Sequence, residues 1–205
     1  MKTVQALRLL FMPITTSSNP QRNIKLQIAL LIFFLGIMWG AECLNFLVDG
    51  RLDQYGIVPR STIGLRGILF APFLHVSFAH LITNSLPFFI LGGFVMLRRT
   101  GDFLWVTAIV MLVGGLGTWL IAPADTVHVG ASGVIFGYLG FLMARGYFER
   151  SLVSMVVSIA IGVTYGSLIW GVLPGQTGIS WQGHFFGLLG GIMAARLLVP
   201  RNNDS

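Results

Sequence analysis

Charged residues are scarce in this chain of 205 residues: Asp, Glu, Lys and Arg together make up 10%, against about 25% in a soluble globular domain. Hydrophobic residues make up 55%, and the mean hydropathy is +0.81. The 26 glycines follow no period of three, which excludes a collagen-like chain. The low charge and high hydropathy also exclude a water-soluble globule and a disordered chain, and they predict an integral membrane protein.

Cysteine is almost absent, since Cys43 is the only one and lies inside an apolar run. This excludes an intrachain disulfide and a cysteine-based metal cluster. Four histidines, His75, His80, His128 and His184, could hold a metal ion by number alone, but no HExxH motif or acidic partner accompanies them. The sequence therefore predicts neither a metal nor a cofactor.

Acidic residues are fewer than basic ones, 7 against 13, which leaves a net charge of +6. In a soluble domain this balance would suggest nucleic-acid binding, whereas in a membrane protein it indicates that the loops on the two sides differ in charge. Cytoplasmic Lys and Arg side chains also contact anionic lipid headgroups. We therefore expect membrane lipids, and no nucleic acid, among the partners.

Long apolar runs are abundant. A helix needs roughly 17 to 25 apolar residues to cross a hydrocarbon core of about 30 Å. Six stretches match this pattern, of which the fourth and sixth are short: 26–48, 73–97, 103–122, 132–144, 152–173 and 183–199. The predicted fold class is an all-α polytopic membrane protein with six transmembrane helices.

The basic residues predict the orientation. Ten of them lie before the first helix, between the second and third, between the fourth and fifth, and at the end of the chain, while the other side has three, all in the first loop. Because Lys and Arg stay in the cytoplasm, both termini are expected inside. The predicted organisation is a cytoplasmic segment 1–25, a transmembrane domain 26–199 with an external loop 49–72, and a cytoplasmic tail 200–205.

Polar side chains at membrane depth are costly and indicate function. The depth of a residue can be counted by helical rise from the arginine at the cytoplasmic end of its helix. By this count Asn84, Ser132 and His184 lie about 21, 20 and 18 Å above the cytoplasmic end. His80 precedes Asn84 by four residues, so it lies on the same helix face one turn nearer the outside. Three helices are thus expected to bring polar groups to one level.

Small residues surround the serine and the histidine. Glycines four residues apart let helices approach closely, and those expected to support the site are Gly130, Gly133, Gly187 and Gly191. The fourth and sixth helices should therefore pack together and bring Ser132 within hydrogen-bond reach of His184. Taken alone, a serine among glycines is ordinarily a packing residue, but the depth that it shares with a histidine favours chemistry.

A serine paired with a histidine suits nucleophilic catalysis. The imidazole takes the hydroxyl proton, and an acyl intermediate divides one difficult step into two. The amide N–H of Ser132 at a helix N-terminus, with His80 and Asn84 as side-chain donors, could stabilise the oxyanion. The predicted reaction class is acyl transfer to water.

Three sequence strings carry a resemblance to a known family. VGASGVIFG at 129–137, HLITN at 80–84 and GHFFGLLGG at 183–191 resemble the signatures of the rhomboid family of intramembrane serine proteases, in the family's order. A GxSG string alone would be weak, but the three together are specific. The resemblance covers nearly the whole chain from the first predicted helix onward, and it implies the six-helix rhomboid bundle.

The resemblance also implies residue roles. Ser132 would be the nucleophile and His184 the general base of a catalytic dyad that acts on transmembrane protein substrates. His80, Asn84 and the amide of Ser132 would form the oxyanion hole. Phe136 matches the family's aromatic position that supports the catalytic histidine.

Two positions depart from the family pattern. Leu65 precedes Arg66 where the family often has a Trp-Arg pair, which predicts a weaker hold on the first external loop. Gly183 precedes His184 where alanine is common, which predicts a slightly looser sixth helix.

The sequence thus predicts an intramembrane serine endopeptidase that cuts transmembrane proteins near the external face of a bacterial inner membrane. One alternative is a non-proteolytic rhomboid-like protein that binds transmembrane segments in quality control, and the presence of both Ser132 and His184 argues against it. A small-solute transporter is another alternative. The lack of internal repeats and of charge pairs inside the membrane argues against that one.

Overall fold

The computed structural model describes residues 20–97, 99–176 and 178–199, and within these ranges its regular structure is helical apart from one isolated β-bridge. The all-helical prediction is confirmed for this part of the chain. The predictions for the tail 200–205, and for all but the last residues of the segment 1–25, lie outside the described residues.

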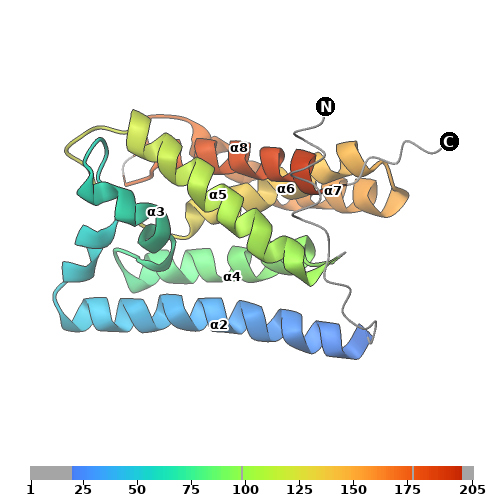
Figure 1. Ribbon diagram of the computed structural model, residues 1–205, viewed down its shortest axis with the longest axis horizontal. Coiled ribbons are helices and arrows are strands. Elements are labelled where there is room, and N and C mark those ends of the chain that lie inside the picture. The colour runs from blue at the N-terminus through green and yellow to red at the C-terminus, as the bar shows by residue number, and fades with distance from the viewer. Residues whose placement is uncertain (1–19, 98, 177, 200–205) are drawn as a thin grey trace.

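The long helices form one bundle, in which α2 lies at an edge against α4 and α5 crosses in front at an angle (Figure 1). In the described residues these helices are α2 (Pro20–Leu47), α4 (Phe78–Val95), α5 (Thr100–Ile121), α6 (Ser132–Glu149), α7 (Leu152–Tyr165) and α8 (Trp181–Leu198). A 3₁₀ helix, η4 (Gly166–Val172), continues α7.

Three predicted helix boundaries are wrong by about a turn or more. α2 begins at Pro20 rather than at residue 26, with a proline at the first helical position, where its missing N–H costs nothing. α4 begins at Phe78 rather than at residue 73, because Ser77 is extended and its side chain accepts the N–H of His80 as an N-cap. α6 continues past residue 144 to Glu149, because the buried Arg145 and Glu149 form an ion pair of 2.8 Å along the helix.

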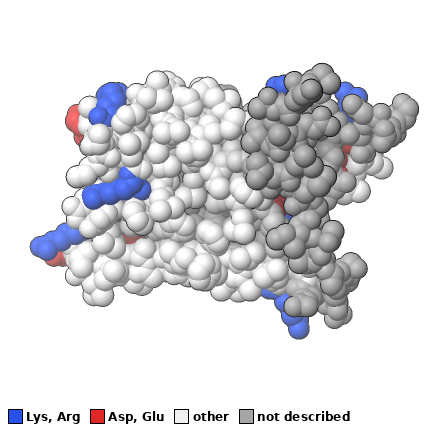
Figure 2. All heavy atoms as spheres, viewed as in Figure 1, with Lys and Arg blue, Asp and Glu red and all other residues white. Residues whose placement is uncertain are grey.

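Four helical segments of the described chain are long and apolar enough to cross a membrane: Asn23–Leu47, Phe78–Val95, Thr100–Ile121 and Leu152–Val172. On the face shown in Figure 2, charged side chains lie at the two ends of the molecule and an uncharged band lies between them. The protein is an integral membrane protein, because these helices are long and apolar enough to span lipid and many of their large apolar side chains are exposed.

The centre of the bundle is built around α6, which packs against α4, α5, α7 and α8. Phe88, Phe103 and Tyr138 pack ring against ring in the core, with centroids 5.7 to 6.1 Å apart. The buried Tyr138 hydroxyl lies 2.7 Å from the hydroxyl of Thr107, so its polar end is satisfied. The site helix α6 is therefore held from all sides.

The segment between α2 and α4 is folded rather than extended. It consists of η1 (Arg51–Tyr55), η2 (Ile63–Arg66), α3 (Gly67–Phe70) and η3 (Ala71–Phe73). Arg66 donates to the carbonyl oxygen of Gln54 at 3.0 Å, and its guanidinium lies 4.3 Å from the ring centroid of Tyr55. Arg66 therefore contacts two residues of this segment, although Leu65 precedes it in place of the tryptophan that is common in the family that the sequence resembles.

Candidate active site

Ser132 and His184 meet in the bundle. Ser132 is the first residue of α6, and its Oγ lies 2.8 Å from Nε2 of His184, which is in the first turn of α8. The serine is half-buried and the histidine is buried. The structure thus brings together the two residues that the sequence analysis paired.

The second ring nitrogen of His184 determines which way this hydrogen bond runs. Nδ1 lies 3.0 Å from the carbonyl oxygen of Gly171 in η4, and a carbonyl can only accept. Nδ1 therefore carries the hydrogen of a neutral imidazole, Nε2 is left as the acceptor, and the hydroxyl of Ser132 donates to it. Sequence reasoning missed Gly171, because every residue has a backbone carbonyl and none is marked in the sequence.

Phe136 lies flat on the imidazole. The two rings are 4.0 Å apart at their centroids and 9° from parallel. Because Phe136 is one turn along α6 from Ser132, a single helix supplies both the hydroxyl and the surface on which the imidazole rests. Phe136 therefore fixes the plane of the His184 ring, and Gly171 fixes its orientation within that plane.

Glycines set the distance between α6 and α8. A Cβ atom built on Gly187 would overlap the carbonyl oxygen of Gly133, and one built on Gly191 would overlap the carbonyl oxygen of Gly137. The two backbones are therefore in direct contact, which only residues without a side chain permit. This approach keeps Ser132 and His184 within hydrogen-bond distance.

Gly130 shapes the turn that leads into α6. Its φ of +121° lies in the region that favours glycine, and its N–H donates to the carbonyl oxygen of Ala71 at 2.9 Å. A Cβ atom at this position would lie 2.7 Å from Cε1 of His80. The ring of His80 therefore lies directly against the backbone two residues before Ser132.

Asn84 and His80 lie on one face of α4. The amide nitrogen of the buried Asn84 donates to the carbonyl oxygen of His80 at 2.9 Å. The half-buried His80 has a ring nitrogen, Nδ1, with no hydrogen-bond partner among the described residues. Among the described residues, neither of these two side chains is hydrogen-bonded to Ser132. Their donors are therefore not used by the serine in this structure.

His75 belongs to the same region. It is fully buried, its Nε2 accepts the N–H of Ala131 at 3.3 Å, and its ring meets that of His80 edge to face at 5.1 Å. Burial, with His80 as the second cause, lowers the pKa of His75 to about 4. A neutral His75 therefore holds the backbone that precedes Ser132.

The four histidines make different contacts. His75 and His80 contact each other, His128 bonds to Thr126 and Ser180, and His184 bonds as described above. Among the residues that the structure describes, no three His, Cys, Asp or Glu side chains are grouped to hold a metal ion.

Comparison with known proteins places this sequence in a family. The sequence model described as Rhomboid domain matches residues 62–201, more than half of the chain. The chain belongs to the rhomboid family. This rhomboid is 41% identical to an uncharacterised protein of Mycobacterium tuberculosis over 82% of its own chain and 73% of the relative.

Two relatives in Bacillus subtilis have names that state an activity. The putative rhomboid protease YdcA is 33% identical over 62% of this rhomboid and 64% of the relative. The rhomboid protease GluP is 30% identical over 85% of this rhomboid, which covers only 34% of that longer relative. The family and these relatives support a membrane-bound protease.

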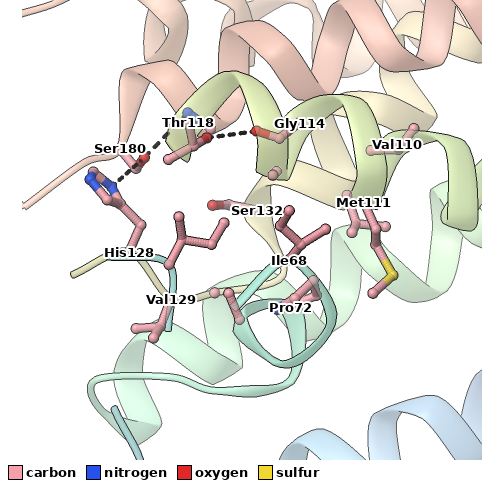
Figure 3. Close-up of a pocket in the computed structure, with 17 residues that line it drawn as sticks. Ile68, Pro72, Val110, Met111, Gly114, Thr118, His128, Val129, Ser132 and Ser180 are labelled. Carbon is pink, nitrogen blue, oxygen red and sulfur yellow. Dashed lines mark hydrogen bonds between the residues drawn. The ribbon is translucent and has the colours of Figure 1, made fainter. Parts of the chain in front are cut away.

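A cavity of about 50 Å³ opens beside Ser132 in this rhomboid. Its walls come from α3, α5, the turn before α6 and the starts of α6 and α8, and they include Ile68, Met111, Gly114, Thr118, Ser132 and Ser180 (Figure 3). One water needs roughly 10–15 Å³ of such volume. The cavity therefore has room for a small side chain or a few water molecules next to the hydroxyl.

Proposed function

We propose that the protein is an intramembrane serine endopeptidase in which Ser132 and His184 form a catalytic dyad. The observation that carries the proposal is the 2.8 Å hydrogen bond between them, with Nδ1 of His184 engaged by Gly171. In this tautomer Nε2 takes the hydroxyl proton as Oγ attacks the scissile carbonyl. The same nitrogen returns the proton to the leaving amine, and water then hydrolyses the acyl-enzyme.

Three donors are proposed for the oxyanion. The amide N–H of Ser132 is in the first turn of α6, where no intrahelical carbonyl is available to it. The uncommitted nitrogen of His80 and the second hydrogen on Nδ2 of Asn84 complete the set. Fixed donors aimed at the developing charge stabilise the transition state without reorganising.

The proposed substrates are transmembrane proteins, cut near the external face. The proposal rests on the expected topology, also proposed here, of six spans within 26–199 with both termini in the cytoplasm of a bacterium, in which Ser132 would lie toward the side of the external segment 49–72. A regular helix shields its peptide bonds, so a substrate must unwind locally, and Gly or Pro near the cut would ease this. The cavity beside Ser132 supports a small residue at the cut.

Labelling with a serine-directed fluorophosphonate probe tests the dyad. The purified protein in detergent micelles should label at Ser132, and Ser132→Ala and His184→Ala should each abolish the labelling. Cleavage of a model transmembrane substrate in liposomes, located by mass spectrometry, should disappear in parallel. A native protein that binds the substrate without labelling or cleavage would instead support a non-proteolytic role.

A further inference from the structure

His128 lies in the turn between α5 and α6, four residues before Ser132, and both of its ring nitrogens are engaged. Nδ1 lies 2.7 Å from Oγ of Ser180, and Nε2 lies 2.8 Å from Oγ1 of Thr126. Figure 3 shows the imidazole pointing from its turn to Ser180, the residue at the start of α8. The side chain thus joins two segments 52 residues apart.

The hydrogens of this group run in one direction. The hydroxyl of Thr126 donates to the carbonyl oxygen of Pro123 at 2.6 Å, so Thr126 must accept from Nε2–H of His128. Nδ1 then has a lone pair, to which the hydroxyl of Ser180 donates. Ser180 in turn accepts the N–H of Gly183 at 3.2 Å. One neutral tautomer of His128 therefore gives a partner to every donor and acceptor in this series of hydrogen bonds.

The backbone of His128 is engaged as well. Its N–H and carbonyl pair with those of Ile57 in an antiparallel bridge, at 3.0 and 2.9 Å. Ile57 belongs to the segment between α2 and α4, next to η1. Three parts of the protein, namely that segment, the turn into α6 and the start of α8, therefore meet at one residue.

The hydrogen bond between His128 and Ser180, called the link below, lies beside Ser132 and His184. Ser180 caps α8 and is one turn before His184, whose own N–H donates to the carbonyl oxygen of Ser180 at 3.1 Å. His128 is likewise four residues before Ser132, and all three of Ser132, His128 and Ser180 line the same cavity. The contact from His128 to Ser180 thus joins the ends of the two helices that carry the reacting groups.

We propose that His128 is a positioning residue that holds the first turn of α8 against the turn into α6 and thereby sets the distance from His184 to Ser132. The glycine contacts of Gly187 and Gly191 with the backbone of α6 hold α8 one and two turns after His184, whereas the contact from His128 reaches Ser180, one turn before His184. This inference rests on the proposed function, which supplies the reaction by which it is measured.

Substitutions at His128 separate positioning from mere folding. His128→Asn retains an acceptor oxygen near the place of Nδ1 for the hydroxyl of Ser180, whereas His128→Ala removes both ring contacts. We expect His128→Ala to lower kcat on a model transmembrane substrate about 10-fold or more, since small misplacements of a catalytic group are costly, with KM within about 2-fold. His128→Asn should restore most of kcat. Val127→Ala, at an exposed neighbouring position, is the control and should be unchanged.

A substitution of Ser180, which is hydrogen-bonded to His128, provides a second test. Ser180→Ala removes the same hydrogen bond together with the cap on the N–H of Gly183, but leaves the ring and the Ile57 bridge in place, so it carries the test if His128→Ala does not fold. The double variant should be no slower than the worse single variant, because both act through one contact. An unchanged kcat in Ser180→Ala, or a loss in His128→Ala that Asn does not restore, would overturn the inference.

A measurement without turnover distinguishes the inference from the proposed function. Hydrogen exchange of the amides of Gly183 and His184 should be faster in His128→Ala than in the native protein. Faster exchange in a protein that never labels at Ser132 would support the link and refute the protease. Normal labelling together with unchanged exchange and kcat in His128→Ala would refute the link alone.

Discussion

Gly171 and His184 are joined by a hydrogen bond of 3.0 Å from the imidazole Nδ1 to the backbone carbonyl oxygen. The group that orients the histidine is therefore a peptide carbonyl in η4 rather than the carboxylate found in many serine hydrolases. A carbonyl cannot take up a proton, so it fixes the tautomer and the ring edge without adding a charge to the membrane interior.

Crowding of Gly171 tests this arrangement. A Cβ atom there would lie 2.9 Å from Cζ of Phe136 and 3.0 Å from Nδ1 of His184, so Gly171→Ala should displace the imidazole and lower kcat about 10-fold or more. Gly166→Ala, at the start of the same 3₁₀ helix with open space around it, is the control. Equal kcat values for the two variants, measured on one substrate, would exclude a role for this contact.

The dyad predicts strong non-additivity. Ser132→Ala and His184→Ala should each lower turnover by about 10³-fold or more, and the double variant should be no worse than either, because the two residues act as a unit. Thermal unfolding of Ser132→Ala in detergent should change little, since Ser132 is half-buried beside a cavity. Multiplicative losses, or turnover that EDTA abolishes and zinc restores, would contradict the proposed mechanism.

The proposed role of Asn84 predicts different effects on kcat and on KM. As an oxyanion donor it acts in the transition state, so Asn84→Ala should lower kcat by about 10²-fold with little change in KM. Because its amide also donates to the carbonyl oxygen of His80, a loss of stability of about 1 kcal/mol should accompany the change. Steady-state kinetics and thermal unfolding measure the two effects, and a variant altered only in KM would place Asn84 in substrate binding.

Gly191 tests the contact between α6 and α8. Gly191→Ala would push a methyl group into the carbonyl oxygen of Gly137, so we expect a loss of at least about 1–3 kcal/mol in stability, with lower activity as the helices separate. Gly162→Ala, in α7 with no atom near its Cβ, should be neutral or stabilising. Unfolding curves in the same detergent compare them, and a stable, active Gly191→Ala protein would refute the close approach.

The helices of the described chain and the contact between Ser132 and His184 were predictable from local sequence. Apolar runs and glycine spacing indicate helices and their contact faces, because a helix forms its hydrogen bonds within one segment and repeats its faces every 3.6 residues. The strings around His80, Ser132 and His184 resemble a family, so their partnership could be stated before any coordinates. The end of α6 was misplaced because Arg145 was interpreted as a boundary, whereas its ion pair with Glu149 keeps both charges inside the helix.

Only the tertiary structure decided how those residues are held. The carbonyl of Gly171, the buried nitrogen of His75 that accepts from Ala131, and the contact of His128 with Ser180 all join segments distant along the chain. Backbone carbonyls and amides occur at every position, and a histidine looks the same in sequence whether it faces solvent or a helix end. Such partners are selected by packing in three dimensions, where the cost of leaving a buried polar group unpaired determines which of them meet.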